Sequence, residues 1–119
     1  MEERRQHIRI SEVLAVNYRI LRRLIAFTSR SEDISVAGMR LATAHRLETE
    51  MVLGLNFSLF ERTEPLVVDA KVVWQKEVQD VRAPFVVGVK FININPVVSN
   101  ALASFIQEKF AERKSMNMG

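Results

Sequence analysis

Two short segments near the front of the sequence hold the side chains best suited to binding an anionic ligand. The first is rich in arginine, and the second, further along the chain, has the pattern Asp-x-Ser-x-x-Gly. A guanidinium group is planar and can fork onto phosphate oxygens or onto a pair of neighbouring acceptors on a base. An ionised carboxylate only accepts hydrogen bonds, so it can bind N–H donors of a ligand. The candidate binding residues are Arg4, Arg5, Arg9, Asp33, Ser35 and Gly38.

Neighbouring residues in these segments have structural alternatives. Ser35 has a short hydroxyl that could reach a phosphate or a base, or could bond the backbone of its own turn. Gly38 permits either a positive φ or a close backbone approach. For His7 we expect a positioning role rather than ligand contact, and for Trp74, on the apolar face of an expected strand, core packing rather than base stacking.

Catalytic and metal-binding patterns are missing from the sequence. Neither His7 nor His45 has a second ligand at metal-binding spacing, and the chain has no cysteine. There is no Gly-x-Ser-x-Gly elbow, no P-loop and no Gly-x-Gly-x-x-Gly motif. We therefore expect no catalytic residues, no metal and no cofactor, and we expect the protein not to be an enzyme.

Size and charge fit a single domain spanning residues 1–119. The formal net charge is +3, and residues 1–30 hold seven arginines against three glutamates. A locally basic segment suggests an anionic partner, and a solvated charged face is the alternative that the charge alone leaves open. Since no apolar run resembles a membrane span or a signal peptide, we expect no membrane insertion and a cytoplasmic location.

The middle of the chain alternates apolar and polar residues, as half-buried strands do. After Asn95 and Pro96 the apolar residues change to helical spacing. The pattern predicts a mainly all-β fold, a six-stranded antiparallel β-barrel with a C-terminal α-helix on its outside or over one end. The expected strands are 12–21, 24–29, 38–46, 51–59, 66–75 and 85–91, and the expected helix is 96–113.

The two motifs, in this order and ahead of a barrel pattern, closely resemble the PilZ domain family, whose members are receptors for cyclic di-GMP. Val72-Val73-Trp74 and the stretch 87–91 extend the resemblance over nearly the whole chain. The resemblance implies that Arg5 and Arg9 form the arginine motif, and that Asp33, Ser35 and Gly38 form the second motif. It also implies a flexible ligand-binding segment at 1–11, a barrel at 12–94 and a helix at 96–113. Ile8 stands where many relatives have proline.

The resemblance further implies a receptor and adaptor that binds cyclic di-GMP, changes conformation and signals to a partner protein. Arg4, just before the arginine motif, tends in this family to accompany two intercalated ligand molecules per chain. One alternative is a PilZ-like interaction scaffold that binds no ligand. A second is a small basic barrel that binds nucleic acid. We expect no DNA or RNA partner, because the chain has one Trp and one Tyr and no basic stripe interleaved with aromatics.

Overall fold

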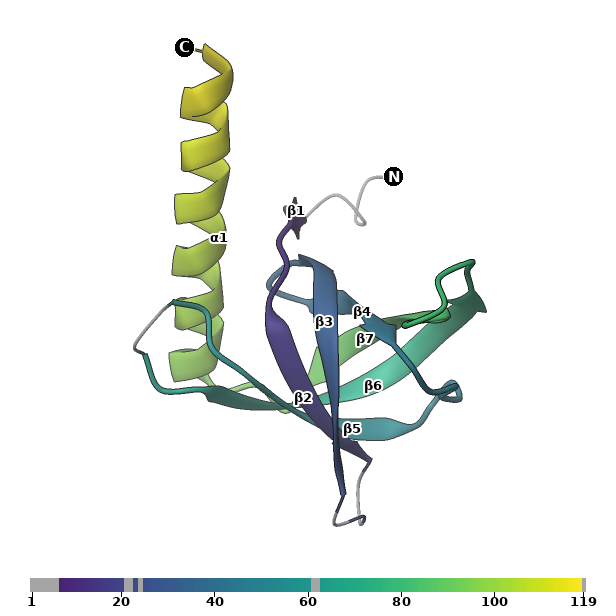
Figure 1. Ribbon diagram of the computed structural model, residues 1–119. Coiled ribbons are helices and arrows are strands. Elements are labelled where there is room, and N and C mark those ends of the chain that lie inside the picture. The colour runs from purple at the N-terminus through teal and green to yellow at the C-terminus, as the bar shows by residue number, and fades with distance from the viewer. Residues whose placement is uncertain (1–6, 21–22, 24, 61–62, 119) are drawn as a thin grey trace, which may run out of the picture.

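The structure is a computed structural model that describes residues 7–20, 23, 25–60 and 63–118, with side chains given as far as residue 115 (Figure 1). Strands are the commonest element in this part of the chain, and they are followed by a long helix. The elements are β1 (Ile10–Ser11), β2 (Ala15–Ile20), β3 (Ala26–Ile34), β4 (Gly38–Thr43), β5 (Val52–Phe57), β6 (Leu66–Glu77), β7 (Phe85–Ile92) and α1 (Pro96–Met118).

Strands β2 to β7 form a closed barrel. The hydrogen-bonded order is β1-β3-β2-β5-β6-β7-β4, and an additional pairing of β3 with β4 closes the ring. All paired strands run antiparallel. The predicted six-stranded antiparallel barrel with a C-terminal helix is therefore confirmed, and β1 is a short extra strand beside the end of β3. Closure leaves the six barrel strands without an unpaired edge.

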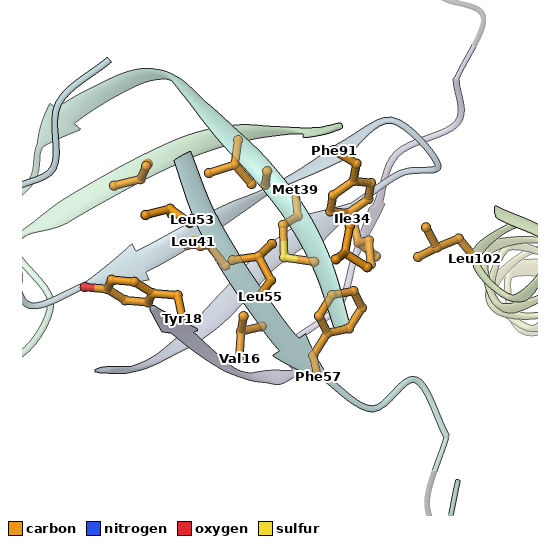
Figure 2. Close-up of a cluster of buried hydrophobic side chains, with 14 of the residues drawn as sticks. Val16, Tyr18, Ile34, Met39, Leu41, Leu53, Leu55, Phe57, Phe91 and Leu102 are labelled. Atoms are coloured by element: carbon orange, nitrogen blue, oxygen red, sulfur yellow. The ribbon is translucent and has the colours of Figure 1, made fainter. Parts of the chain in front are cut away.

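The barrel interior is filled by alternate side chains of its strands, as the period of two predicts. In β2, Val16 and Tyr18 are buried while the residues between and beside them are exposed. Figure 2 shows Leu53, Leu55 and Phe57 of β5 entering the same cluster. Burying a large apolar side chain stabilises the fold by about 1.5 to 3 kcal/mol, so this interior holds the strands in fixed register.

Helix α1 covers one end of the barrel. It begins at Pro96, and the side chain of Asn95 caps it by accepting a hydrogen bond from the Val98 amide at 2.9 Å. Leu102 and Phe105 are fully buried, and Figure 2 shows Leu102 facing the end of the core that contains Phe91. The helix extends past the expected end at residue 113, to Met118. It is not apolar enough to cross a membrane.

Two strands depart from the predicted alternation at β-bulges. The register of β3 against β4 shifts between Ser31 and Asp33, and that of β6 against β7 shifts between Val72 and Trp74. A bulge adds one residue to a strand and so turns the following side chain to the opposite face. Strand β3 extends beyond its predicted end at residue 29 and includes Asp33. Because of the bulge, the Asp33 side chain lies on the outer face of the barrel, opposite Arg40. The prediction that Trp74 packs in the core is wrong, because its bulge leaves the side chain on the surface, 38% exposed.

Candidate ligand-binding site

A row of cross-strand neighbours on the outside of the barrel joins the two bulges. Asp33 of β3 pairs with Arg40 of β4, Arg40 pairs with Gly88 of β7, and Gly88 pairs with Trp74 of β6. Since glycine has no side chain, the Trp74 ring lies close over Gly88, where a Cβ atom would collide with it, and the row borders a hollow. The hollow has a volume of about 380 Å³, and Arg9 also lines it.

Asp33 is the electrostatic centre of this hollow. Its side chain is 6% exposed, and each carboxylate oxygen accepts a hydrogen bond from a different arginine. Arg9 Nη1 donates to Oδ1 at 2.6 Å, and Arg40 Nε donates to Oδ2 at 2.7 Å. Hydrogen bonds between ionised partners are short and strong, so the pair of arginines offsets the cost of burying the carboxylate. The structure thus brings together one residue from each of the two predicted motifs.

The segment before β2 positions Arg9. Ile10 and Ser11 of β1 pair with Ile34 and Asp33 of β3, so the preceding residue lies beside the Asp33 carboxylate. Ser31 holds the segment that follows, because its buried hydroxyl donates to the Glu12 carbonyl at 2.6 Å and accepts from the Leu14 amide at 2.9 Å. Arg9 itself stays 48% exposed at its side chain and is fixed by no strand pairing.

Ser35 and Gly38 form the turn between β3 and β4. Ser35 Oγ accepts hydrogen bonds from the Ala37 amide at 3.0 Å and the Gly38 amide at 3.2 Å, and the residue is 1% exposed. Of its two possible roles, this geometry matches stabilisation of the turn. Gly38 has no positive φ, but a Cβ atom there would collide with the Val89 carbonyl oxygen. Its glycine is therefore required by close backbone approach.

Arg4 and Arg5, the remaining predicted site residues, lie outside the described residues. Sequence reasoning missed Arg40 and Gly88, although the signal for Arg40 was present. It alternates with Met39 and Leu41, which are buried, so the period of two places it on the outer face of β4. Within the described ranges, no three His, Asp or Glu side chains gather in a way that could hold a metal ion.

A second hollow, of about 700 Å³, adjoins the first at Arg9 and separates β1 from α1. Ile10 and Ser11 line it on the strand side, and the helix contributes three residues, Phe110, Arg113 and Lys114. An ion pair of 2.5 Å between Arg113 Nη2 and Glu12 Oε1 spans the two sides. The segment that carries Arg9 is thereby linked to the helix.

Residues 3–108 match the family model described as PilZ domain. This chain belongs to the PilZ domain family. Similar solved structures include the inhibitor of motility MotI/DgrA of Bacillus subtilis, with a TM-score of 0.78 and 19% identity over 92% of this PilZ domain and 53% of that chain. They also include the Escherichia coli protein YcgR in complex with c-di-GMP, with a TM-score of 0.71 and 21% identity over 98% of this chain and 51% of that one.

The isolated PilZ domain of E. coli YcgR, solved with c-di-GMP, has a TM-score of 0.68 and 21% identity, covering 95% of this chain and 98% of the other. This PilZ domain spans about half the length of MotI and of the longer YcgR chain. No curated protein sequence matches it. At these identities the structures share the fold, and together with the family model they support a family of cyclic di-GMP receptors and effectors.

Proposed function

We propose that this PilZ domain is a non-enzymatic receptor that binds cyclic di-GMP in the hollow at Asp33 and Arg9. The observation that carries the proposal is the 2.6 Å contact between these residues, which come from two motifs that are separate in the sequence. Both motifs were predicted to bind the same ligand. Their meeting at a hollow on the outer barrel face supports a single shared site.

The chemistry of the hollow matches the parts of a guanine dinucleotide. The Asp33 carboxylate can accept hydrogen bonds from guanine N1 and N2, and Arg9, with Arg4 and Arg5, can fork onto phosphates or onto guanine O6 and N7. Trp74 adds an exposed ring on which a purine can stack. Base recognition and phosphate recognition are thus available within one surface.

Binding at this site would also reach the helix, which is why we propose an adaptor that signals to a partner protein. Arg9 must turn from Asp33 towards the ligand, and the segment that follows it carries Glu12, the ion-pair partner of Arg113 on α1. Ordering of a basic segment by an anionic ligand is a known kind of switch. We propose that the rearranged surface of this segment and α1 engages the partner.

Titration calorimetry with cyclic di-GMP, GTP and a short oligonucleotide separates the three candidate functions. We expect saturable binding of cyclic di-GMP alone, together with a higher melting temperature, since a ligand at one hundred times its Kd adds about 2.7 kcal/mol of stability. A folded protein that binds none of the three is an interaction scaffold, and one that prefers the oligonucleotide is a nucleic-acid-binding barrel. Either result overturns the proposal.

The same titration tests the proposed stoichiometry of two cyclic di-GMP molecules per chain. Two stacked ligands bring four phosphate charges together, and an extra guanidinium from Arg4 can offset their repulsion while it stacks on an outer guanine. We expect two ligands on the parent and fewer, or more weakly bound, on Arg4→Leu. Saturation of the parent at one ligand contradicts this proposal, and so does a leucine variant that binds two with unchanged affinity.

A further inference from the structure

Arg40 lies in the centre of the outer row but belongs to neither sequence motif. Its backbone is held in the ladder on both sides, because it pairs with Asp33 of β3 and with Gly88 of β7. Its side chain is 39% exposed, lines the hollow, and donates from Nε to Asp33 Oδ2 at 2.7 Å. Arg40 is therefore a fixed partner of the Asp33 carboxylate.

Arg9 differs from Arg40 in how it is held. It precedes β1 and has no strand pairing of its own, so the ion pair to Oδ1 can open without breaking the barrel. Ligand binding as proposed requires this opening, because Arg9 must reach the ligand and Oδ1 must accept from guanine. Asp33, at 6% exposure, would then lose one of its two cationic partners. A buried charge without a partner is strongly destabilising, so a second cation that stays in place is needed.

We propose that Arg40 is a positioning and specificity-determining residue, which holds Asp33 through Oδ2 so that Oδ1 faces guanine after Arg9 has turned to the ligand. This inference rests on the proposed function. Arg40 holds the carboxylate in place and prevents its rotation, so the acceptor geometry for guanine N1 and N2 is preserved. Arg9 is the exchangeable partner and Arg40 is the permanent one.

The test compares two ligands on four proteins by titration calorimetry. The ligands are cyclic di-GMP and cyclic di-inosine monophosphate, whose base keeps N1–H but lacks the N2 amine that Asp33 would recognise. The proteins are the parent, Arg40→Met, Arg40→Lys and the control Arg30→Met. Arg30 is a matched control, because it is exposed on β3, forms an ion pair of 3.7 Å with Asp80, and is not among the residues that line the hollow.

We expect Arg40→Met to weaken cyclic di-GMP binding about tenfold or more, as loss of a charge-assisted hydrogen bond does. The preference for cyclic di-GMP over the inosine analogue should narrow by about threefold or more, since a mobile carboxylate recognises the N2 amine less well. Arg40→Lys should recover part of both losses, and Arg30→Met should stay within about twofold of the parent. A role confined to folding would lower the melting temperature without altering the preference.

A double-mutant cycle with Asp33→Asn decides whether Arg40 acts through Asp33. If it does, adding Arg40→Met to Asp33→Asn changes the affinity by no more than about twofold, although the same change costs tenfold in the parent. If the methionine variant does not fold, Arg40→Lys enters the cycle in its place. Arg40 is not a positioning residue if its effect persists in the Asp33→Asn background, or if both ligands weaken equally.

The outcomes also separate this inference from the function on which it rests. A folded parent that binds no cyclic di-GMP overturns the proposed function and the inference together. A parent that binds cyclic di-GMP, beside an Arg40→Met variant with unchanged affinity and unchanged preference, overturns the inference alone.

Discussion

The inner and outer faces of β3 and β4 are built from neighbouring residues with opposite chemistry. On the inside, Ile34 and Leu41 are completely buried in the apolar core. On the outside, one residue away on each strand, Asp33 and Arg40 form an ion pair beside an open hollow. The inner contacts fix the backbone, whereas the outer side chains border an open, partly exposed surface. A closed barrel therefore supplies a rigid frame for the charged side chains that line the hollow.

Leu41→Ala removes core contacts from the inner face and changes no side chain on the outer face. Leu41 is fully buried, and a leucine-to-alanine change in a core costs about 2 to 5 kcal/mol through lost burial and the cavity that remains. We expect a loss of this size in urea unfolding, the largest effect among our predictions. The fraction that stays folded should bind cyclic di-GMP with the affinity of the parent. A variant with the unfolding free energy of the parent would show that the inner face does not supply the stability of the barrel.

Arg9→Ala and Arg5→Ala test the proposed ligand contacts of the arginine motif. Each arginine should form charge-assisted bonds to the ligand, so each change should cost about 1.5 to 3 kcal/mol of binding free energy or more. Unfolding by urea should barely change for Arg5→Ala, because Arg5 precedes all the strands. Arg9→Ala also removes an ion pair to the buried Asp33 carboxylate, so we expect it to cost about 1 kcal/mol of stability as well. Arg46→Ala, which removes an exposed arginine that does not line the Asp33 hollow, is the control. An arginine whose alanine variant binds cyclic di-GMP as tightly as the parent is not a contact residue.

The inner and outer faces differ in how far the sequence could predict them. Period-two alternation identified the barrel strands, and buried Val16 and Tyr18 follow it in β2, because burial imposes that pattern directly. A bulge inserts one residue without any compositional mark, so the outward turn of Trp74 was not visible in the sequence. The bulge before Asp33 was equally invisible, so this residue was predicted to lie in a turn, whereas it lies in a strand.

The contacts within the hollow depend on register, which a single sequence does not encode locally. Arg40 reaches Asp33 because the bulge sets these two residues opposite each other. Gly88, the neighbour of Arg40 on β7, leaves space for the Trp74 ring. Motif patterns select residues that are close in the sequence. They could not select a partner that is brought in by pairing with a neighbouring strand.

Tyr18→Phe tests the inner face by its smallest feature, a single hydroxyl group. Tyr18 is 1% exposed, its ring centroid lies 5.3 Å from that of Phe27, and its hydroxyl has no hydrogen-bond partner among the described residues. Figure 2 shows this oxygen at the side of the core cluster away from Leu102. A buried polar group without a partner is costly, while phenylalanine keeps the ring. We expect the variant to be more stable in urea by about 1 kcal/mol, with unchanged ligand affinity.

The pH dependence of the unfolding free energy, compared between the parent and Tyr18→Phe, tests whether the Tyr18 hydroxyl is desolvated in the folded protein. Burial raises the pKa of Tyr18 above its ordinary value of 10.0. Above that pH the unfolded chain releases the phenolic proton while the folded chain retains it, so the parent loses stability as pH rises, by at most about 1.4 kcal/mol per pH unit from this group. The phenylalanine variant lacks this contribution, and other titrating groups cancel in the difference between the two proteins.

The difference in stability between the two proteins should therefore be constant below about pH 9 and widen towards about pH 11. A gap that stays constant across this range means that the hydroxyl is solvated in the folded protein. Since Tyr18 is the only tyrosine in the chain, its ultraviolet titration in the folded state reports the same pKa directly.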